Sequence, residues 1–522
     1  MSLYTEENWN EFVAKTEDSY KVKSYPHVDP IFNFPTSKHK LKSILSDTTG
    51  KKVSNHAFAP FLKILQKTPR YRYQEASDKY KLETKIRPIS FASHFDTYIL
   101  GFYSYCLNKK YQKFITDHNF SDPILAYRSD LNGKCNIQFA KDTFDSVKAR
   151  VKSKGTCSAI ALDIKGYFDH IDHRILKLMW LKVIGLDELP RDHYHIFRTI
   201  TKYSYINYIS FLKHFNINLK AIEKKQKQKY PDRKFTPKGY NSILDLIPND
   251  LVGPAYKDKM GYLRKMNLIT INRNKDRSLS KNGIPQGSSI SALLSNIYLL
   301  DFDKELYEKA IREGFSYRRY CDDLLIICDT DRVNELKNYV MNLMIDKYKL
   351  TIQDKKTEII DFKLSLQKKV RGFKRHYNKD TTEFEELPNT NSNFKNLQYL
   401  GFEFNGQKVF IRPGSLSRYF RKLKARIVKT VGMSYSKNSK SHKIFKQQIY
   451  SRYSHFGKRN FLSYALNAAK KEYSNSDGEI KEGMNSPAIK KQISKHMKII
   501  HQEILKTSEQ RRKQKKAKKL KV

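Results

Sequence analysis

The stretch YRRYCDDLLIICD, residues 317–329, decides the fold of this chain. Aromatic and apolar residues lie on both sides of Cys321-Asp322-Asp323, and flanks of this kind favour β-strands. The segment therefore predicts two strands joined by a tight turn. Two adjacent carboxylates at the tip of such a hairpin repel each other, and a bound divalent cation relieves the repulsion.

A second carboxylate-bearing segment is CSAIALDIKGYFDHIDH, residues 157–173. Its first residues are small and apolar enough for a buried strand, which Asp163 closes before a glycine-containing turn. Three carboxylates on neighbouring strands would hold two Mg²⁺ ions, one activating a hydroxyl and one stabilising a leaving oxygen. For either segment alone, a helix N-cap at Asp163 and plain turn residues at Asp322 and Asp323 are the simpler interpretation.

The composition indicates a folded protein with a polyanionic partner. The chain has 522 residues, with 100 Lys and Arg against 53 Asp and Glu, and a net charge of +47. Hydrophobic residues at 39% and aromatic residues at 13% predict several cores rather than wholesale disorder. The acidic, polar start MSLYTEENWNEF and the short apolar runs predict neither a signal peptide nor a membrane span. Five cysteines without a CxxC pair fit a reducing cytoplasm.

The segment RYFRKLKARIVKTVG, residues 418–432, predicts a cationic amphipathic helix. Its apolar residues recur every three or four positions and form one stripe, made of Phe420, Leu423, Ile427 and Val431. Basic residues cover the rest of the helix, as contact with a phosphate backbone requires. A membrane surface would suit this helix equally well.

Two further stretches are basic and poor in apolar residues. Lys220–Lys238 is rich in lysine and broken by proline, which predicts a polar insertion inside a folded domain. The C-terminal RRKQKKAKKLKV, residues 511–522, is either a solvated disordered end or an arm that binds a polyanion.

Between the two carboxylate segments lies GIPQGSSISALLSNIYL, residues 283–299. The order DIKGYFD, PQG and YCDD resembles the reverse transcriptases of the right-hand polymerase group. Gln286 precedes Asp322 by 36 residues and Asp322 precedes Lys356 by 34, spacings that agree with that family. Four more segments resemble its fingers, palm-lysine and primer-grip motifs: KIRPISFASHFD (85–96), AYRSDLNGK (126–134), LTIQDKKTEII (350–360) and QYLGFEF (398–404).

The resemblance implies a catalytic site. Asp163, Asp322 and Asp323 would ligate two Mg²⁺ ions, with Mn²⁺ as an alternative and the carbonyl of Ile164 as a further ligand. A primer 3′-hydroxyl or a protein hydroxyl would attack a dNTP and release pyrophosphate. Lys356 would act as the general acid for that leaving group.

The resemblance also implies contacts to substrate and nucleic acid. The nucleotide pocket would contain Lys85, Arg87, Arg128, Phe168, Gln286 and Gly287. A bulky ring at Phe168 clashes with a 2′-hydroxyl, so the product would be DNA; otherwise Phe168 is plain core. Leu400 and Gly401 would form the primer grip. The nucleic-acid backbone would meet Arg418, Arg421, Lys422, Lys424 and Arg426.

Among reverse transcriptases, the chain is most similar to the bacterial defence-associated, or abortive-infection, enzymes of the unknown group, and next to the group II intron type. The first likeness implies phage defence in the bacterial cytoplasm with a non-coding RNA as template or scaffold, homo-oligomer assembly and no membrane contact. The alternatives are a template-independent DNA-synthesising nucleotidyltransferase, a group II intron maturase and, as the weakest, a non-enzymatic RNA-binding scaffold.

The expected architecture is an α+β right hand with fingers, palm and thumb. The palm would be a mostly antiparallel sheet backed by helices. The expected parts are an N-terminal extension with fingers (1–155), a palm with a polar insertion at about 215–260 (156–410), a helical basic thumb-like domain (411–505) and a cationic tail (506–522).

Overall fold

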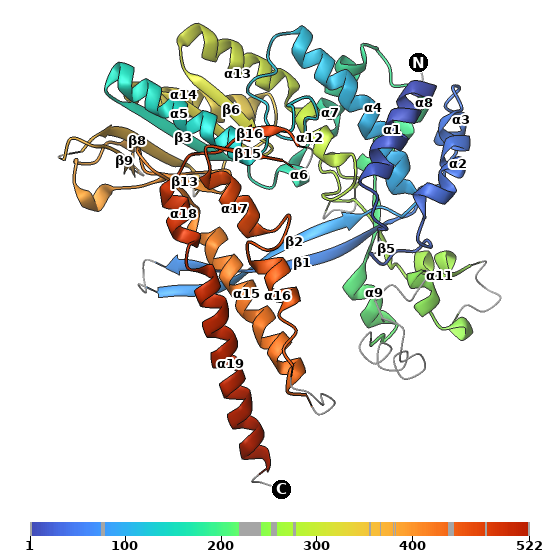
Figure 1. Ribbon diagram of the computed structural model, residues 1–522. Coiled ribbons are helices and arrows are strands. Elements are labelled where there is room, and N and C mark those ends of the chain that lie inside the picture. Colours follow the sequence, from blue (N-terminus) through green and yellow to red (C-terminus); the bar gives the residue numbers. More distant parts are fainter. Residues whose placement is uncertain are drawn as a thin grey trace.

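The computed structural model shows an α+β protein (Figure 1). The predicted polar insertion Lys220–Lys238 and the last three residues of the cationic tail lie outside the described residues. Among the described residues, no helix is both long enough and apolar enough to cross a membrane. The structure describes 3–519 apart from 24, 75–78, 219–241, 252–257, 275–277, 354–355, 366, 379, 382, 437–442 and 476–477.

The central feature is a five-stranded sheet with the order β6-β7-β3-β8-β9, in which every neighbouring pair is antiparallel. This confirms the antiparallel palm sheet expected from the sequence. The strands are β3 (Cys157–Asp163), β6 (Ser316–Tyr320), β7 (Asp323–Cys328), β8 (Glu358–Leu364) and β9 (Val370–Lys374).

Both faces of this sheet are buried, because side chains alternate along each strand. In β7, Leu324 and Ile326 join a large core on one face, whereas Leu325 and Ile327 join a second core on the other. The unbroken apolar run of the sequence is therefore a two-sided strand. Helices around these cores include α4 (Asp96–Asp117), α5 (Asn136–Lys154), α6 (Tyr167–His170), α7 (His173–Ile184), α8 (Arg191–Thr201), α12 (Ser291–Tyr298), α13 (Leu300–Glu313) and α14 (Val333–Asp346).

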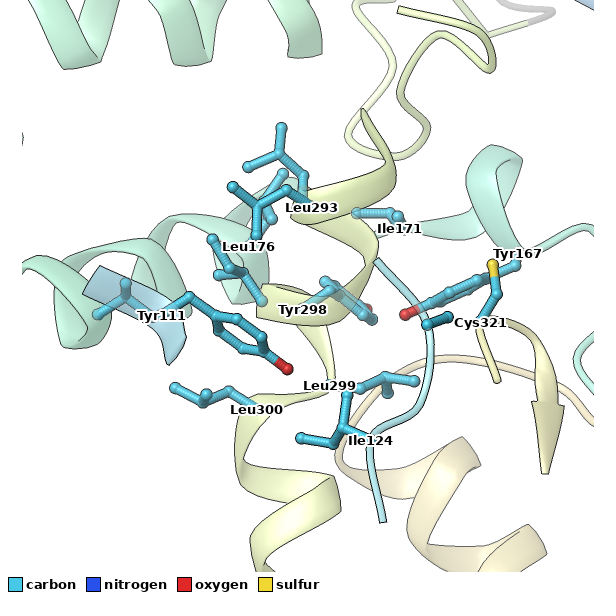
Figure 2. Close-up of a cluster of buried hydrophobic side chains, with 14 of the residues drawn as sticks. Tyr111, Ile124, Tyr167, Ile171, Leu176, Leu293, Tyr298, Leu299, Leu300 and Cys321 are labelled. Atoms are coloured by element: carbon cyan, nitrogen blue, oxygen red, sulfur yellow. The ribbon is translucent and has the colours of Figure 1, made fainter. Parts of the chain in front are cut away.

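The large core reaches the turn between β6 and β7. Figure 2 shows Tyr298 on α12 and Tyr167 beside Cys321 within this core. The Tyr167 hydroxyl donates to the carbonyl of Ser295, and the Tyr298 hydroxyl donates to the carbonyl of Tyr348 at 2.6 Å. Buried hydroxyls are thus satisfied by backbone carbonyls, which fixes the packing beneath the turn.

A second sheet carries a long hairpin of β1 (Phe61–Gln74) and β2 (Lys79–Phe91), which Figure 1 shows crossing the molecule toward the C-terminal helices. The sheet order is β2-β1-β4-β5, with β4 (Ser204–Asn207) parallel to β1, followed by β5 (Ile269–Ile271). Both short strands flank the predicted insertion and fall in the range expected for the palm, yet β4 pairs with the fingers hairpin and β5 extends the same sheet. The predicted domain boundaries stay a prediction.

Smaller elements complete the N-terminal half. The helices α1 (Glu6–Asp18), α2 (Phe34–Leu45) and α3 (Lys51–Ser54) pack against one another and the first two against α4, where Phe12 meets Phe102 edge to face. Beside β4, a third core contains Leu62, Phe211 and Leu263. The helices that contribute to this core are α9 (Tyr208–His214), η2 (Ile243–Leu246) and α11 (Lys259–Lys265), and η3 (Asn249–Leu251) lies between the last two in the chain.

The C-terminal part begins with a small sheet and continues as helices. The helix α15 packs against α19 through Leu423, Ile427 and Val431, which confirms most of the predicted stripe. Tyr419 takes the fully buried place at its start, and Phe420 is half-buried beside it. The elements are β12 (Leu397–Tyr399), β13 (Phe402–Phe404), β14 (Val409–Ile411), α15 (Pro413–Ser434), α16 (Gln447–Tyr453), α17 (Phe461–Ala469), α18 (Pro487–Ile493) and α19 (His496–Lys519).

The helix α19 includes most of the segment expected as a cationic tail, because it continues to Lys519. Figure 1 shows it projecting away from the rest of the molecule. The remaining short elements are β10 (His376–Tyr377), β11 (Phe384–Glu385), β15 (Glu472–Ser474), β16 (Ile480–Glu482), η4 (Thr330–Arg332) and η6 (Asn391–Asn393).

Candidate active site

The palm sheet brings the three predicted carboxylates together where strands β3 and β7 meet at one end of the sheet. Asp163 at the end of β3 is the direct register partner of Asp323 at the start of β7. Asp322 precedes Asp323 in the turn, and its carbonyl accepts a hydrogen bond from the N–H of Ile164 at 3.1 Å. Backbone pairing therefore joins the two carboxylate segments at Asp163 and at the next residue, Ile164. All three carboxylates line one cavity of about 670 Å³.

The turn before Asp322 is held from below by a buried ion pair. Cys321 has a φ of 58°, in the left-handed region that a non-glycine residue rarely adopts. Arg319, with 0% of its side chain exposed, donates to the carbonyl of Cys321 at 3.1 Å and to Asp303 at 2.7 Å. A further donation goes to Asn296 at 3.1 Å. The guanidinium therefore fixes the strained turn to α12 and α13.

The charge of this guanidinium is secured by its partner. Burial alone would lower the pKa of Arg319, but the carboxylate of Asp303 outweighs burial and raises that pKa. The sequence offers no signal for this role, because Arg318 and Arg319 are adjacent and only the strand pleat decides which one points inward.

Two neighbouring carboxylates make the charged form of Asp323 less favourable. Surrounding protein atoms desolvate Asp323 although its side chain opens toward the cavity, and Asp322 and Asp163 repel it. Together these effects raise the pKa of Asp323 to about 6. The ammonium of Lys356 acts in the opposite direction and lies 2.6 Å from Asp163. Lys356 is thus a resident cation of this acidic cluster.

The donor set suits a hard divalent cation. Among the described residues, no three His, Cys, Asp or Glu side chains already converge as a complete cation site. One oxygen of Asp163 is instead taken by the ammonium of Lys356. Neighbouring carboxylates raise the pKa of Asp323, a cation would relieve that repulsion, and carboxylate oxygens are the ligands that Mg²⁺ prefers. Asp163, Asp322 and Asp323 therefore fit such an ion.

Basic residues from the fingers hairpin line the same cavity. Lys85 and Arg87 lie two residues apart on β2, and thus on one face of it, and Arg70 of β1 pairs with Glu83 on that face. Burial lowers the pKa of Lys85, and the neighbouring charges of Arg87, Arg70 and Lys356 lower it further. This concentration of cations opposite the carboxylates suits a polyphosphate.

Residues of the C-terminal part close the cavity. Leu400 and Gly401, with positive φ angles of 45° and 92°, form the predicted turn between β12 and β13. The N–H of Arg412 donates to the carbonyl of Gly401 at 3.0 Å, which places the start of α15 beside this turn. Of the predicted backbone contacts, Arg418 and Arg421 line the cavity.

The fingers and α15 touch directly across the cavity. Arg421 donates to the carbonyl of Pro69 at 3.2 Å, and its guanidinium lies 5.8 Å from the ring centre of Tyr71. Arg70 and Arg412 also line the cavity, and neither was among the predicted site residues. In the sequence, Arg70 is an arginine in a strand pattern and Arg412 is an arginine before a proline. Both patterns recur elsewhere in this basic chain, so neither indicates a functional site.

Other predicted contacts lie outside this cavity. Arg128 pairs with Asp130 and donates to the carbonyl of Ile124, and its side chain is only 5% exposed. Its role here is to close its own loop. Lys424 pairs with Glu503 on α19 at 2.6 Å, Arg426 donates to Gln448, and Lys422 is exposed to solvent.

The predicted PQG turn packs against the fingers rather than lining the cavity. Gly287 has a φ of 110°, and a Cβ there would lie 2.7 Å from the side chain of Ile89. The carbonyl of Gln286 accepts from the N–H of Ser90 at 2.8 Å. The close approach that requires glycine is therefore to β2. Phe168 is half-buried against Tyr167 and the large core.

Comparison with known proteins decides the family of the central part. Residues 249–404 match the reverse transcriptase (RNA-dependent DNA polymerase) family. The chain carries a reverse transcriptase domain. The Retron Se72 reverse transcriptase of Salmonella heidelberg (strain 579083-10) is 35% identical over 81 residues, which are 15% of this chain and 21% of that protein. The aligned part spans about a fifth of that relative's length.

Solved structures of telomerases are also similar to this chain. The apo enzyme from Candida tropicalis, truncated from its C-terminal domain, aligns with 72% of this chain and 60% of its own, at 11% identity and a TM-score of 0.37. The Candida albicans enzyme with a fragment of telomeric RNA aligns with 94% and 68%, at 10% identity and a TM-score of 0.34.

The matched range includes the turn of Asp322 and Asp323. It contains the PQG turn, Asp322, Asp323 and Lys356, whereas Asp163 precedes it. Pairing of β3 with β7 brings Asp163 to the reverse transcriptase turn. The resemblance to reverse transcriptases inferred from the motifs is thereby confirmed.

Proposed function

We propose that the protein is an RNA-directed DNA polymerase that transfers nucleotides from dNTPs to a hydroxyl. The observation that carries the proposal is the meeting of Asp163, Asp322 and Asp323 in one cavity with the cations Lys356, Lys85 and Arg87. An acidic cluster that binds metal, opposed by cations that bind phosphates, is the arrangement that phosphoryl transfer requires.

The chemistry follows from these positions. Two Mg²⁺ ions held by Asp163, Asp322, Asp323 and the carbonyl of Ile164 would lower the pKa of the attacking hydroxyl and stabilise the leaving oxygen. The hydroxyl oxygen forms a bond to the α-phosphorus as the bond to pyrophosphate breaks. Lys85 and Arg87 hold the triphosphate, and Lys356 donates a proton to the departing pyrophosphate. Leu400 and Gly401 support the primer end.

Discrimination between sugars is assigned to Phe168. It lies five residues after Asp163 on α6, and its carbonyl accepts from the N–H of Ile284 at 2.9 Å, next to the PQG turn. This hydrogen bond connects the backbone of Phe168 to the segment that contains Gln286 and Gly287. We propose that all three meet the incoming nucleotide when the cavity is loaded, and that the ring excludes a 2′-hydroxyl.

The partner is proposed to be a non-coding RNA that serves as template or scaffold, and the biological role to be antiviral defence in bacteria. The net charge of +47 supports a polyanionic partner. The match to the Retron Se72 reverse transcriptase supports a bacterial origin of this domain. The defence role rests on the resemblance of the sequence motifs to the defence-associated enzymes.

The decisive experiment purifies the full chain, sequences the RNA bound to it, and sequences the DNA that it makes from dNTPs and Mg²⁺. We expect DNA complementary to a bound RNA. The paired variant Asp322→Asn/Asp323→Asn should make none, while Asp117→Asn, which alters an exposed carboxylate on α4 paired to Lys113, should match the parent protein. DNA synthesis by the paired variant contradicts the mechanism. A homopolymer made from one dNTP without RNA favours a template-independent nucleotidyltransferase.

A further inference from the structure

A second cavity, of about 440 Å³, lies apart from the carboxylates. It is formed by the end of α1 and the segment after it, by α4, and by the start of α12. Its volume falls within the range of small-ligand sites. Its lining combines cations, tyrosines and amide groups, and the members that matter here are Lys15, Lys23, Tyr98, Asn108, Tyr127 and Leu293.

The first notable group is a half-buried ammonium. Lys23 lies 4.7 Å from the ring centre of Tyr98, and burial lowers its pKa to about 8. No carboxylate of the described residues counters that effect by pairing with Lys23. A desolvated cation without an anionic partner favours an anion from outside the chain. Lys15 in the same lining adds to the positive potential.

The second group is an unused acceptor. The amide oxygen of Asn108 is buried and has no hydrogen-bond partner, whereas its amide nitrogen donates to Ser129 at 3.4 Å. Such an atom is costly unless a donor reaches it. Asn108 lines the cavity, so a rotation of its amide would present this oxygen to a ligand with an N–H or O–H group.

The third group connects this cavity with the catalytic turn. Tyr127 lines the cavity with 45% of its surface exposed, and its hydroxyl donates to the sulfur of Cys321 at 3.6 Å. Cys321 directly precedes Asp322. An exposed aromatic ring beside cations is the element on which nucleobases stack. The ring therefore links the cavity to the site of chemistry.

We propose that this cavity binds one unpaired nucleotide next to the catalytic turn. Its phosphate pairs with Lys23, a base or sugar donor reaches Asn108, and the base stacks on Tyr127. The nucleotide is either part of a single strand or free. That a bound strand would be the one being copied rests on the proposed function, whereas nucleotide binding itself does not.

Acylation of lysines tests the site directly. The full chain carrying Asp322→Asn/Asp323→Asn is treated near pH 8 with an N-hydroxysuccinimide ester, and modified lysines are identified by mass spectrometry. A lowered pKa makes Lys23 reactive, because more of it is uncharged. We expect a short single-stranded RNA, or AMP and UMP alone, to protect Lys23 but not the exposed Lys113 of α4. Protection by the RNA alone would show that the bound nucleotide is part of a single strand, and protection by AMP or UMP would show that a free nucleotide binds. If neither protects Lys23, the proposal is wrong.

Salt dependence supplies an independent measurement. Lys23→Met should weaken single-strand binding about tenfold, and the slope of log K against log salt should fall by about 0.7, the value for one phosphate contact. Lys113→Met, on an exposed lysine of α4, should change neither. Thermal unfolding of both variants controls for folding. An unchanged slope in a folded Lys23→Met variant overturns the phosphate contact.

These assays separate the two proposals. Binding is measured in the catalytically inactive chain and therefore does not depend on DNA synthesis. If Lys23 is protected but the parent protein makes no DNA, the nucleotide site is supported and the proposed polymerase function is wrong. If the parent protein makes DNA but Lys23 is not protected, the polymerase function is supported and the nucleotide site is wrong.

Discussion

The acidic turn of the palm and the basic helix α15 both present charges to the same cavity, but they hold them differently. Beneath the turn, Arg319 and Asp303 are fully buried, and each hydrogen-bond partner is fixed. On α15, Lys424 is 53% exposed and pairs with a single residue, Glu503. Buried charges define one geometry, whereas exposed charges supply a field that tolerates change.

This difference suits the role proposed for each region. Metal-dependent transfer requires atoms to be placed within fractions of an ångström, which a strained turn at Cys321 supported by a buried guanidinium provides. A nucleic-acid backbone offers a phosphate at every step, so a helix that binds it needs cations without one exact register.

The largest effect is expected from Asp303→Asn, which leaves Arg319 as an uncompensated buried charge. The free energy of unfolding should fall by about 3–5 kcal/mol. Asp301→Asn is a matched control on the same helix, since Asp301 pairs with Lys182 at the surface, and it should cost about 1 kcal/mol or less. Urea unfolding of both variants measures the difference. Equal losses would show that burial of the ion pair does not set the rigidity of the turn.

The second prediction concerns the pH dependence of the acidic turn. The pKa of Asp323 in the folded, metal-free chain is about 6, above the 3.8 of an unperturbed aspartate. A raised carboxyl pKa means that the folded state binds the proton more tightly, so this group lowers stability as the pH rises through that window. Mg²⁺ competes with the proton, so more Mg²⁺ should be needed for half-maximal DNA synthesis below about pH 6.

Lys356→Met sharpens this prediction. The ammonium of Lys356 lowers the pKa of Asp323, so its removal should raise that pKa further. Carboxyl titration by NMR in the metal-free protein measures the shift, with Lys363→Met as a control at a lysine paired to Glu386. A pKa of Asp323 that does not move would contradict the electrostatic coupling between the two residues.

On the helix, smaller effects are expected. Arg418→Ala removes a cation that lines the cavity, so template–primer binding should weaken by about 1 kcal/mol, and the salt slope should fall by about 0.9. Filter binding over a range of salt concentrations measures both. An unchanged slope would show that the duplex does not run along this face.

The palm strands could be predicted because local sequence patterns indicate them. The apolar run of 324–328, and Asp163 at the end of a small apolar segment, require only strand periodicity and the cost of a buried carboxylate. The hairpin with Leu400 and Gly401 at its turn was predicted from the resemblance to reverse transcriptases, and the structure contains it.

The support of the turn could not be predicted. Arg319 finds Asp303 on a helix sixteen residues earlier, and nothing local separates this arginine from its neighbour Arg318. The same holds for β4 and β5, whose place in the sheet of the fingers hairpin depends on long-range packing. Arg128 was assigned from motif resemblance, and its tight pairing with Asp130 is visible only in three dimensions.

The smallest effect is expected at Lys424, and it tests the comparison from the other side. Lys424→Ala removes an ion pair with Glu503 whose members remain accessible to solvent, so stability should fall by about 1 kcal/mol or less, and by less at high salt, which screens the pair. Because the ammonium already has a partner on α19, duplex binding should keep its salt slope, unlike in Arg418→Ala. A double-mutant cycle with Glu503→Ala isolates the pair energy. A slope that falls as far as in Arg418→Ala would mean that Lys424 leaves Glu503 for phosphate, and that the helix recruits even its paired cations when nucleic acid arrives.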